Sequence, residues 1–253
     1  MTRIFSIITI TRHHLAGLKQ TATSLAQENP DLFEWIVIDG ASTDGTPEYL
    51  KTTNAHWISE PDHGIYDAMN KGLERATGDY VLFLNAGDTL ALPRTLEKLA
   101  LILKARPQTP DLIYGDAFET IAGQQIIKAA RPAVTIDQGL FTHHQSIFYR
   151  RETINDLRYD QRYNIAADYK FTAQFLRRCH DIFYWPVPLC HFETGGISQR
   201  QASKGRMQQF LIRRELEMSG PLAEIVILTR QTLAYRLRRH VPKLYGYLRA
   251  GRS

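Results

Sequence analysis

The sequence reads YVLFL at residues 80–84 and continues as NAGD at residues 85–88. A strand that is apolar at every position is typical of a parallel sheet whose two faces are both covered. In an open α/β sheet the ligand crevice lies beyond the carboxyl ends of the strands, where the polar residues of this stretch would stand. The stretch therefore predicts a buried strand with functional groups at its end.

Apolar and amphipathic segments alternate on both sides of this stretch. Strands are expected at residues 4–10, 34–39, 56–59, 80–84, 111–118, 124–130 and 146–149. Helices are expected at residues 15–27, 46–51, 65–76, 94–106 and 168–179. The alternation predicts an α/β fold with a mostly parallel central sheet flanked by helices.

Length and charge limit the possible functions. A chain of 253 residues with 43% apolar composition can bury one large core, so we expect one domain and a tail. Residues 204–253 hold 11 lysines and arginines against three acidic residues, and the rest of the chain is slightly acidic. That distribution argues against a nucleic-acid-binding core. Two cysteines and the lack of a long apolar run predict a cytoplasmic protein, soluble or peripheral on the inner face of the membrane.

Polar residues gather at three of the expected strand ends. They read TITR at residues 9–12, DGASTDG at residues 39–45 and NAGD at residues 85–88. The sequence has neither a glycine-rich P-loop nor a GxGxxG fingerprint, which argues against a P-loop NTPase and a dinucleotide dehydrogenase. A different kind of nucleotide site is therefore needed.

Four segments occur in an order that resembles the family 2 glycosyltransferases. They are SIIT at residues 6–9, WIVIDGASTDGT at residues 35–46, SEPDHGIYDAMNKG at residues 59–72 and GDYVLFLNAGD at residues 78–88. The resemblance covers about residues 1–200 and looks closest to transferases of exopolysaccharide assembly, of the colanic-acid kind. It implies a GT-A fold over residues 1–203 and an inverting transfer of a sugar from a UDP- or GDP-linked donor. The implied acceptor is a glycan or a polyprenyl-lipid-linked glycan of cell-surface polysaccharide synthesis.

The resemblance also implies a metal site and a donor site. Asp88 is the expected ligand of Mn²⁺ or Mg²⁺, because hard cations prefer oxygen donors, and His191 is expected to complete the metal shell. Asn85 stands where many relatives carry the first aspartate of their DxD motif. The alternatives are a turn-capping Asp88 and a structural core histidine at position 191. The expected donor-binding residues are Thr9, Thr11, Arg12, Asp39, Ser42, Asp62, Asp67, Asn70, Lys71 and Asn85.

An inverting transfer needs a base that takes the proton of the acceptor hydroxyl. The family carries its catalytic aspartate in a pair of polar residues, and Asp168 stands at that position with Ala167 in place of the first member. An ordinary helix-capping aspartate is the alternative. His143, His144 and Gln145 precede an expected strand where relatives place acceptor-binding groups, although a histidine pair is more often structural.

The segment 204–253 predicts two basic amphipathic helices, at residues 207–217 and 222–239. Such helices are typical of binding to an anionic membrane surface, and a helix packed on the domain is the alternative. Two other functions stay open at this point: a sugar-binding scaffold that has lost turnover, motivated by Asn85 and Ala167, and a sugar nucleotidyltransferase. The second lacks the glycine-rich basic loop that such enzymes use for triphosphates.

Overall fold

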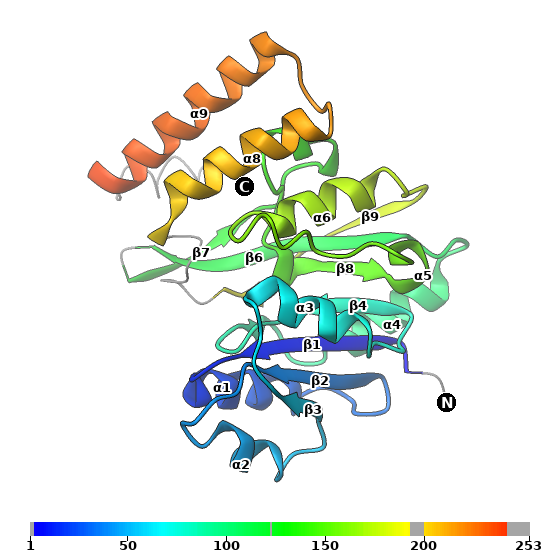
Figure 1. Ribbon diagram of the computed structural model, residues 1–253. Coiled ribbons are helices and arrows are strands. Elements are labelled where there is room, and N and C mark those ends of the chain that lie inside the picture. The colour runs from blue at the N-terminus through cyan, green and yellow to red at the C-terminus, as the bar shows by residue number, and fades with distance from the viewer. Residues whose placement is uncertain (1–2, 122, 193–199, 242–253) are drawn as a thin grey trace.

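The computed structural model describes residues 3–121, 123–192 and 200–241, and the predicted order of strands and helices is confirmed in it (Figure 1). The first half contains β1 (Phe5–Thr11), α1 (Leu15–Leu25), β2 (Phe33–Asp39), α2 (Thr46–Leu50), β3 (His56–Ser59), α3 (Ile65–Leu73) and β4 (Tyr80–Phe83). The second half contains β5 (Thr89–Leu90), α4 (Thr95–Ala105), β6 (Leu112–Ile121), β7 (Gln124–Lys128), β8 (Ile147–Arg150), α5 (Arg151–Ile154), α6 (Ala167–Leu176) and β9 (Ile182–His191). Two 3-10 turns, η1 (Ala133–Gln138) and η2 (His144–Ser146), precede β8, and α8 (Ala202–Glu215) and α9 (Pro221–His240) follow β9.

One sheet of nine strands organises the described residues, in the order β3-β2-β1-β4-β8-β6-β9-β5, with β7 paired to β6. The first four strands are parallel, as predicted. The other half is mixed, because β8 runs antiparallel to β4 and β6 while β9 runs parallel to β6. Only the half that begins the chain is therefore parallel throughout.

Strands β5 and β9 are additions that the sequence did not predict. β5 has only two residues, too few for a periodic pattern. β9 contains Pro186 and Pro188, and prolines argue against a strand because they cannot donate to the ladder. Register shifts on either side of Asp116 in β6 accommodate them.

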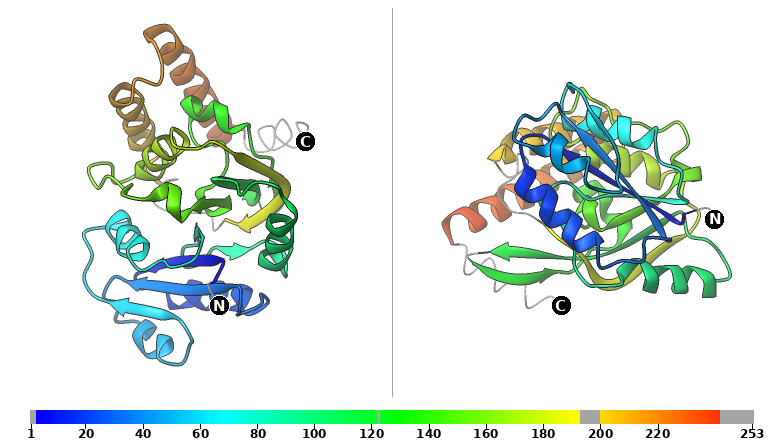
Figure 2. Two further views of the ribbon diagram at one scale, coloured as in Figure 1. Left: turned by 90° about the vertical axis from the view of Figure 1, so that its right-hand side faces the viewer. Right: turned by 90° about the horizontal axis from the view of Figure 1, so that it is seen from below.

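Alternating side chains of the central strands enter two separate cores. Val81 and Phe83 of β4 face the core under α3 and α6, whereas Leu82 and Leu84 face the core under α4. The left view of Figure 2 shows α3 on one side of the sheet and α4 on the other. A fully apolar β4 is therefore required, and each such side chain contributes about 1.5–3 kcal/mol by its burial.

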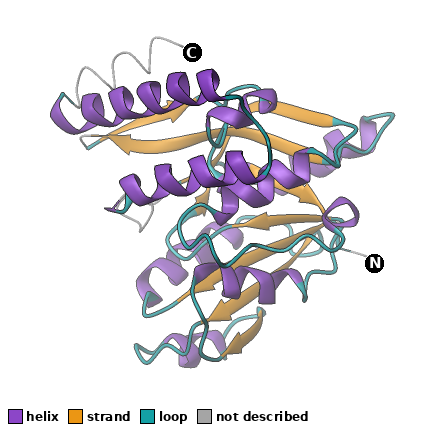
Figure 3. Cartoon of the chain, turned by 45° about the horizontal axis from the view of Figure 1, so that its top comes forward, coloured by secondary structure: helices purple, strands orange, loops and turns teal. Residues whose placement is uncertain are grey.

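The helix α8 contacts both α6 and α9 (Figure 3). Its Ile212 and Arg213 are fully buried, and Ile212 contacts a cluster formed by Ala166 and Tyr169. The buried ammonium of Lys170 on α6 lies 2.5 Å from Glu215 on α8. The predicted C-terminal helices are confirmed. Of the two predicted roles for this segment, membrane binding or packing on the domain, α8 shows the packing. The described residues contain no helix long and apolar enough to cross a membrane.

Candidate functional site

The structure brings the three polar strand ends to one edge of the sheet. Thr11, the last residue of β1, is paired with Asp39, the last residue of β2. β4 lies on the other side of β1, and the turn 85–88 follows it directly. Parallel neighbours end at the same edge, so residues far apart in the sequence meet there.

Asp39 is fully buried, and three hydrogen bonds hold its carboxylate. Oδ2 accepts from the backbone N–H of Ser42 at 3.0 Å and from the Ser59 hydroxyl at 2.5 Å, and Oδ1 accepts from the Ser42 hydroxyl. The Ser42 hydroxyl in turn accepts from the backbone N–H of His13 at 2.7 Å. The carboxylate therefore fixes the turn after β2 and keeps its place at the end of the strand.

Arg12 and Asp62 approach each other across Gly40. The guanidinium lies 4.0 Å from the Asp62 carboxylate, and the Arg12 side chain remains largely exposed. A Cβ atom at position 40 would stand 2.3 Å from the carboxylate oxygen of Asp62, so glycine is needed for this approach. Thr9 lies deeper, where its hydroxyl donates to the Leu84 carbonyl at 2.8 Å.

The predicted donor-binding residues of α3 contact neighbouring segments of the chain. Lys71 Nζ lies 2.8 Å from Glu60 and 3.4 Å from Asp67, and the hydrogen bond to Glu60 raises the pKa of Lys71. The Asn70 amide donates to the Tyr159 carbonyl at 2.9 Å and accepts from the Tyr159 N–H at 2.8 Å. In this arrangement Asn70 and Lys71 hold loops, and their donor contacts remain a prediction.

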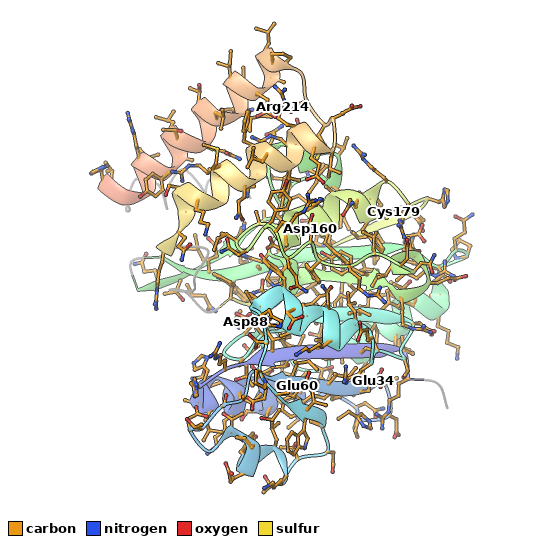
Figure 4. The ribbon with its side chains drawn as sticks, in the orientation of Figure 1. Glu34, Glu60, Asp88, Asp160, Cys179 and Arg214 are labelled. Carbon is orange, nitrogen blue, oxygen red and sulfur yellow. The ribbon has the colours of Figure 1, made fainter. Side chains whose placement is uncertain are left out.

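Asp88 stands at the end of a tight turn after β4 (Figure 4). Its N–H donates to the Asn85 carbonyl at 2.9 Å, and Gly87 takes a φ of 98°, which favours glycine. Thr21 of α1 clamps the turn by donating to the Asp88 carbonyl at 2.8 Å. The Asp88 side chain is almost fully buried, and its Oδ2 accepts from the Gln145 amide at 2.7 Å.

Asp168 lies in the first turn of α6, as predicted, and faces groups from two other elements. His144 Nδ1 lies 3.3 Å from Asp168 Oδ2. The Tyr66 hydroxyl of α3 lies 3.3 Å from Oδ1 and 2.9 Å from the Ile165 carbonyl. Burial, and then the charge of Asp168, raise the pKa of Tyr66 well above its ordinary value, so its hydroxyl stays protonated.

The 3-10 turn η2 connects the two carboxylates. Its consecutive residues His144 and Gln145 contact Asp168 and Asp88 respectively. His144 Nε2 also lies 3.4 Å from the Asn85 amide nitrogen. If Nδ1 carries the proton donated to Asp168, Nε2 is free to accept from Asn85. The geometry gives these two residues a positioning role, and their acceptor contacts remain a prediction.

Oxygen atoms at this edge suit a hard cation and sugar hydroxyls. Within the described residues the side-chain oxygens of Thr11, Asn85 and Gln145 are buried without a hydrogen-bond partner. Two of these residues are linked to Asp88: the Asn85 carbonyl accepts from the Asp88 N–H in the same turn, and the Gln145 amide donates to the Asp88 carboxylate. Mg²⁺ and Mn²⁺ favour such oxygen ligands, so the donor set fits them. The described residues hold no cluster of three or more His, Cys, Asp or Glu side chains able to bind a metal without further ligands.

The other two predicted histidines are held by neighbouring groups. His191 ends β9 opposite Thr89, but its Nδ1 lies 2.7 Å from the Gln125 amide and its ring stacks on Phe118. The glycine pair that follows it in the sequence lies outside the described residues. His143 Nε2 lies 2.6 Å from Glu119. Burial, and then the charge of Lys128, lower the pKa of His143 to about 4.

Sequence reasoning missed the groups that support this site. Thr21, Ser59 and Tyr66 reach it from α1, the end of β3 and α3. Tyr66 lies inside a segment that the sequence singled out, but its partner Asp168 is far away along the chain. Only the tertiary structure shows such a pair.

Residues 6–182 match the family described as glycosyl transferase family 2. A PGL/p-HBAD biosynthesis glycosyltransferase of Mycobacterium bovis is 30% identical over 246 residues, which covers 90% of each chain. The match therefore extends beyond the sheet into the C-terminal helices.

Solved structures share the fold. Staphylococcus aureus TarS 1-349 in complex with UDP-GlcNAc is similar with a TM-score of 0.69 and 19% identity, over 94% of this chain and 74% of that one. Mannosyltransferase PcManGT from Pyrobaculum calidifontis, in complex with GDP-Man and Mn²⁺, is similar with a TM-score of 0.64 and 16% identity, over 96% and 73%. At these identities the likeness shows the fold, which is the GT-A arrangement.

Proposed function

The chain belongs to glycosyl transferase family 2, and from this membership we propose that it transfers a sugar from a UDP- or GDP-linked donor to a glycan or lipid-linked acceptor. The activity places it among the EC 2.4 enzymes. One observation carries the proposal: two carboxylates, Asp88 and Asp168, face one edge of the sheet and are held there by adjacent residues of η2.

The donor lies along the ends of β1, β2 and β4 in this proposal. Asp39 and Ser42 line the nucleoside end, with Arg12 and Asp62 beside them. Asp88 and Asn85 would hold Mn²⁺ or Mg²⁺ at the diphosphate end, and His191 would join them only if its contact with Gln125 were given up. A bound divalent cation would offset the negative charge that develops on the leaving diphosphate. The Mn²⁺ in the mannosyltransferase structure supports this choice of metal.

Asp168 acts as the base. Its carboxylate takes the proton of the acceptor hydroxyl while that oxygen forms the bond to the anomeric carbon, and the bond from this carbon to the diphosphate breaks. Attack from the face opposite the leaving group inverts the anomeric centre. His144 and Tyr66 orient the carboxylate from two sides, which reduces the reorganisation needed during transfer.

The acceptor belongs to cell-surface polysaccharide or glycolipid synthesis in this proposal. The Mycobacterium bovis relative, named for PGL/p-HBAD biosynthesis, and a Bacillus subtilis relative of part of the chain, named for teichuronic acid biosynthesis, support it. We place the enzyme in the cytoplasm, peripheral on the inner face of the membrane, where a lipid-linked acceptor and a nucleotide-sugar would meet. The likeness to colanic-acid enzymes stays a prediction.

Thermal-shift titration with UDP, GDP and their sugars tests the donor and metal sites. One nucleotide should raise the melting temperature only with Mn²⁺, and Asp88→Ala should remove that increase. Asp79→Ala is the matched control, because Asp79 immediately precedes β4 and lies at the other end of the strand. If Asp88→Ala responds like the wild type, the metal assignment is wrong.

Transfer itself is tested with Asp168→Asn. We expect metal-dependent donor binding to persist while nucleotide release falls by about 10²–10⁴-fold, the range that a general base supplies. Donor binding by the wild type without any transfer or donor hydrolysis would favour the scaffold that has lost turnover. Unchanged turnover in Asp168→Asn would show that another group is the base.

A further inference from the structure

The helix α9 has apolar side chains on two opposite faces. Glu224, Ile227 and Gln231 face inward, and Glu224 pairs with the buried Arg213 of α8 at 2.7 Å. On the opposite side, successive residues three or four positions apart point to solvent. Their exposed fractions are 80% for Leu222, 62% for Ile225, 55% for Val226 and 65% for Leu233.

These four side chains and Thr229 form what we call the outer face of α9. A helix has 3.6 residues per turn, so positions 222, 226, 229 and 233 fall on one stripe, with Ile225 beside it. One apolar face is enough to attach a helix to a domain. The inner face is already attached through the buried Ile227 and the Glu224–Arg213 ion pair, so the outer face needs another explanation.

Two arginines flank the outer face. Arg230 and Arg236 are exposed on α9 itself, one on either side of the stripe. The sequence from residue 204 onward carries 11 lysines and arginines against three acidic residues. An apolar stripe flanked by arginines is complementary to an anionic lipid surface, into which the apolar side chains insert while the guanidinium groups contact phosphates.

The same charge disfavours a second copy of this chain as the partner. Pairing two outer faces would bring two strongly basic segments together, and like charges repel across an interface. Figure 1 shows α9 at the periphery of the molecule, with its later part on the side where β1 and β2 end. A flat surface can therefore approach the outer face.

We propose that the outer face of α9 docks the protein on an anionic lipid bilayer. The docking serves the proposed function by bringing the site edge to a lipid-linked acceptor. Only this purpose, and not the docking itself, rests on the proposed function. Contact with lipid requires neither donor nor metal nor turnover. A test of binding is therefore separate from a test of transfer.

Flotation with phosphatidylcholine vesicles, with and without phosphatidylglycerol, measures the docking on the full-length chain. Removing residues from 204 onward would be a poor test, because it would delete the buried Ile212 and Arg213 of α8. We use instead the fourfold variant Leu222→Ser, Ile225→Ser, Val226→Ser and Leu233→Ser. Leu101→Ser on α4, where the side chain is 69% exposed, is the control for loss of an exposed leucine elsewhere.

The wild type and Leu101→Ser should float with the anionic vesicles. The fourfold variant should show partitioning lower by at least about tenfold, because four inserted apolar side chains are replaced by small polar ones. Arg230→Gln with Arg236→Gln should weaken binding to anionic vesicles and leave the melting temperature unchanged.

Three results would overturn the proposal. They are equal flotation of the wild type and the fourfold variant, equal binding to neutral and anionic vesicles, and no binding by the wild type. A wild-type dimer that the fourfold variant converts to monomers, without vesicle binding, would assign the outer face to self-association. Donor binding and transfer measured in solution would stand in each case.

Discussion

Substitution of His144 distinguishes a positioning role from an acceptor-binding role. His144 contacts the proposed base through Nδ1 and the Asn85 amide through Nε2. Asparagine places an amide nitrogen near the position of Nδ1, glutamine places one near Nε2, and leucine keeps similar bulk with neither. The three variants therefore separate the two contacts.

The expected size of the effect follows from the two distances. The separations of 3.3 Å and 3.4 Å are long for hydrogen bonds, so the contact with the carboxylate should contribute about 1–2 kcal/mol, around the lower end of the range of about 1.5–3 kcal/mol for charged groups. Such a loss in the transition state corresponds to about 5–30-fold in kcat. It is smaller than the loss expected for Asp168→Asn, because the base itself remains.

Initial rates of nucleotide release at varied donor and acceptor concentrations provide the measurement. We expect His144→Leu to lower kcat with little change in either KM, and His144→Asn to recover most of the loss. His144→Gln should behave more like leucine. A raised acceptor KM with unchanged kcat in His144→Leu would refute the positioning role and support the acceptor contact that the sequence predicts. Thermal unfolding of each variant checks that the fold is intact.

Two further predictions concern stability. Arg213→Ala should lower the free energy of unfolding by about 3–5 kcal/mol, because Glu224 stays buried without its ion-pair partner. Substitution of the exposed Arg214 by alanine is the control. Equal urea midpoints of the two variants would contradict the prediction. Folding lowers the pKa of His143 from 6.5 to about 4. Between these two pH values the imidazole therefore binds a proton in the unfolded chain but not in the folded chain. Stability should therefore fall as pH decreases through this window, by at most about 1.4 kcal/mol per pH unit, and His143→Gln should flatten this dependence in urea unfolding.

The half of the fold that begins the chain could be predicted because its strands are short apolar runs separated by clear turn residues. In β4 every residue is buried, and the sequence shows this directly. The other half depends on long-range pairing. β9 passes through two prolines and is stabilised by its ladder to β6, which local propensity does not show.

The places of the three predicted carboxylates in the fold were predictable from the sequence, and the contacts around them less so. Asp39, Asp88 and Asp168 lie at strand or helix ends, where the pattern of the chain indicates function. Asn70 follows the same pattern but uses both ends of its amide on the backbone of Tyr159. A side chain that supports a loop and one that binds a ligand have the same residue type, and only the contacts separate them.

The turn η2 sets the spacing between two carboxylates, Asp88 and Asp168, that come from distant parts of the chain. Since His144 and Gln145 are consecutive, one peptide unit, about 3.8 Å between Cα atoms, sets the spacing of the two groups that hold Asp168 and Asp88. An insertion or deletion within this turn should therefore disturb the spacing between Asp88, the proposed metal ligand, and Asp168, the proposed base, even in a protein that folds normally.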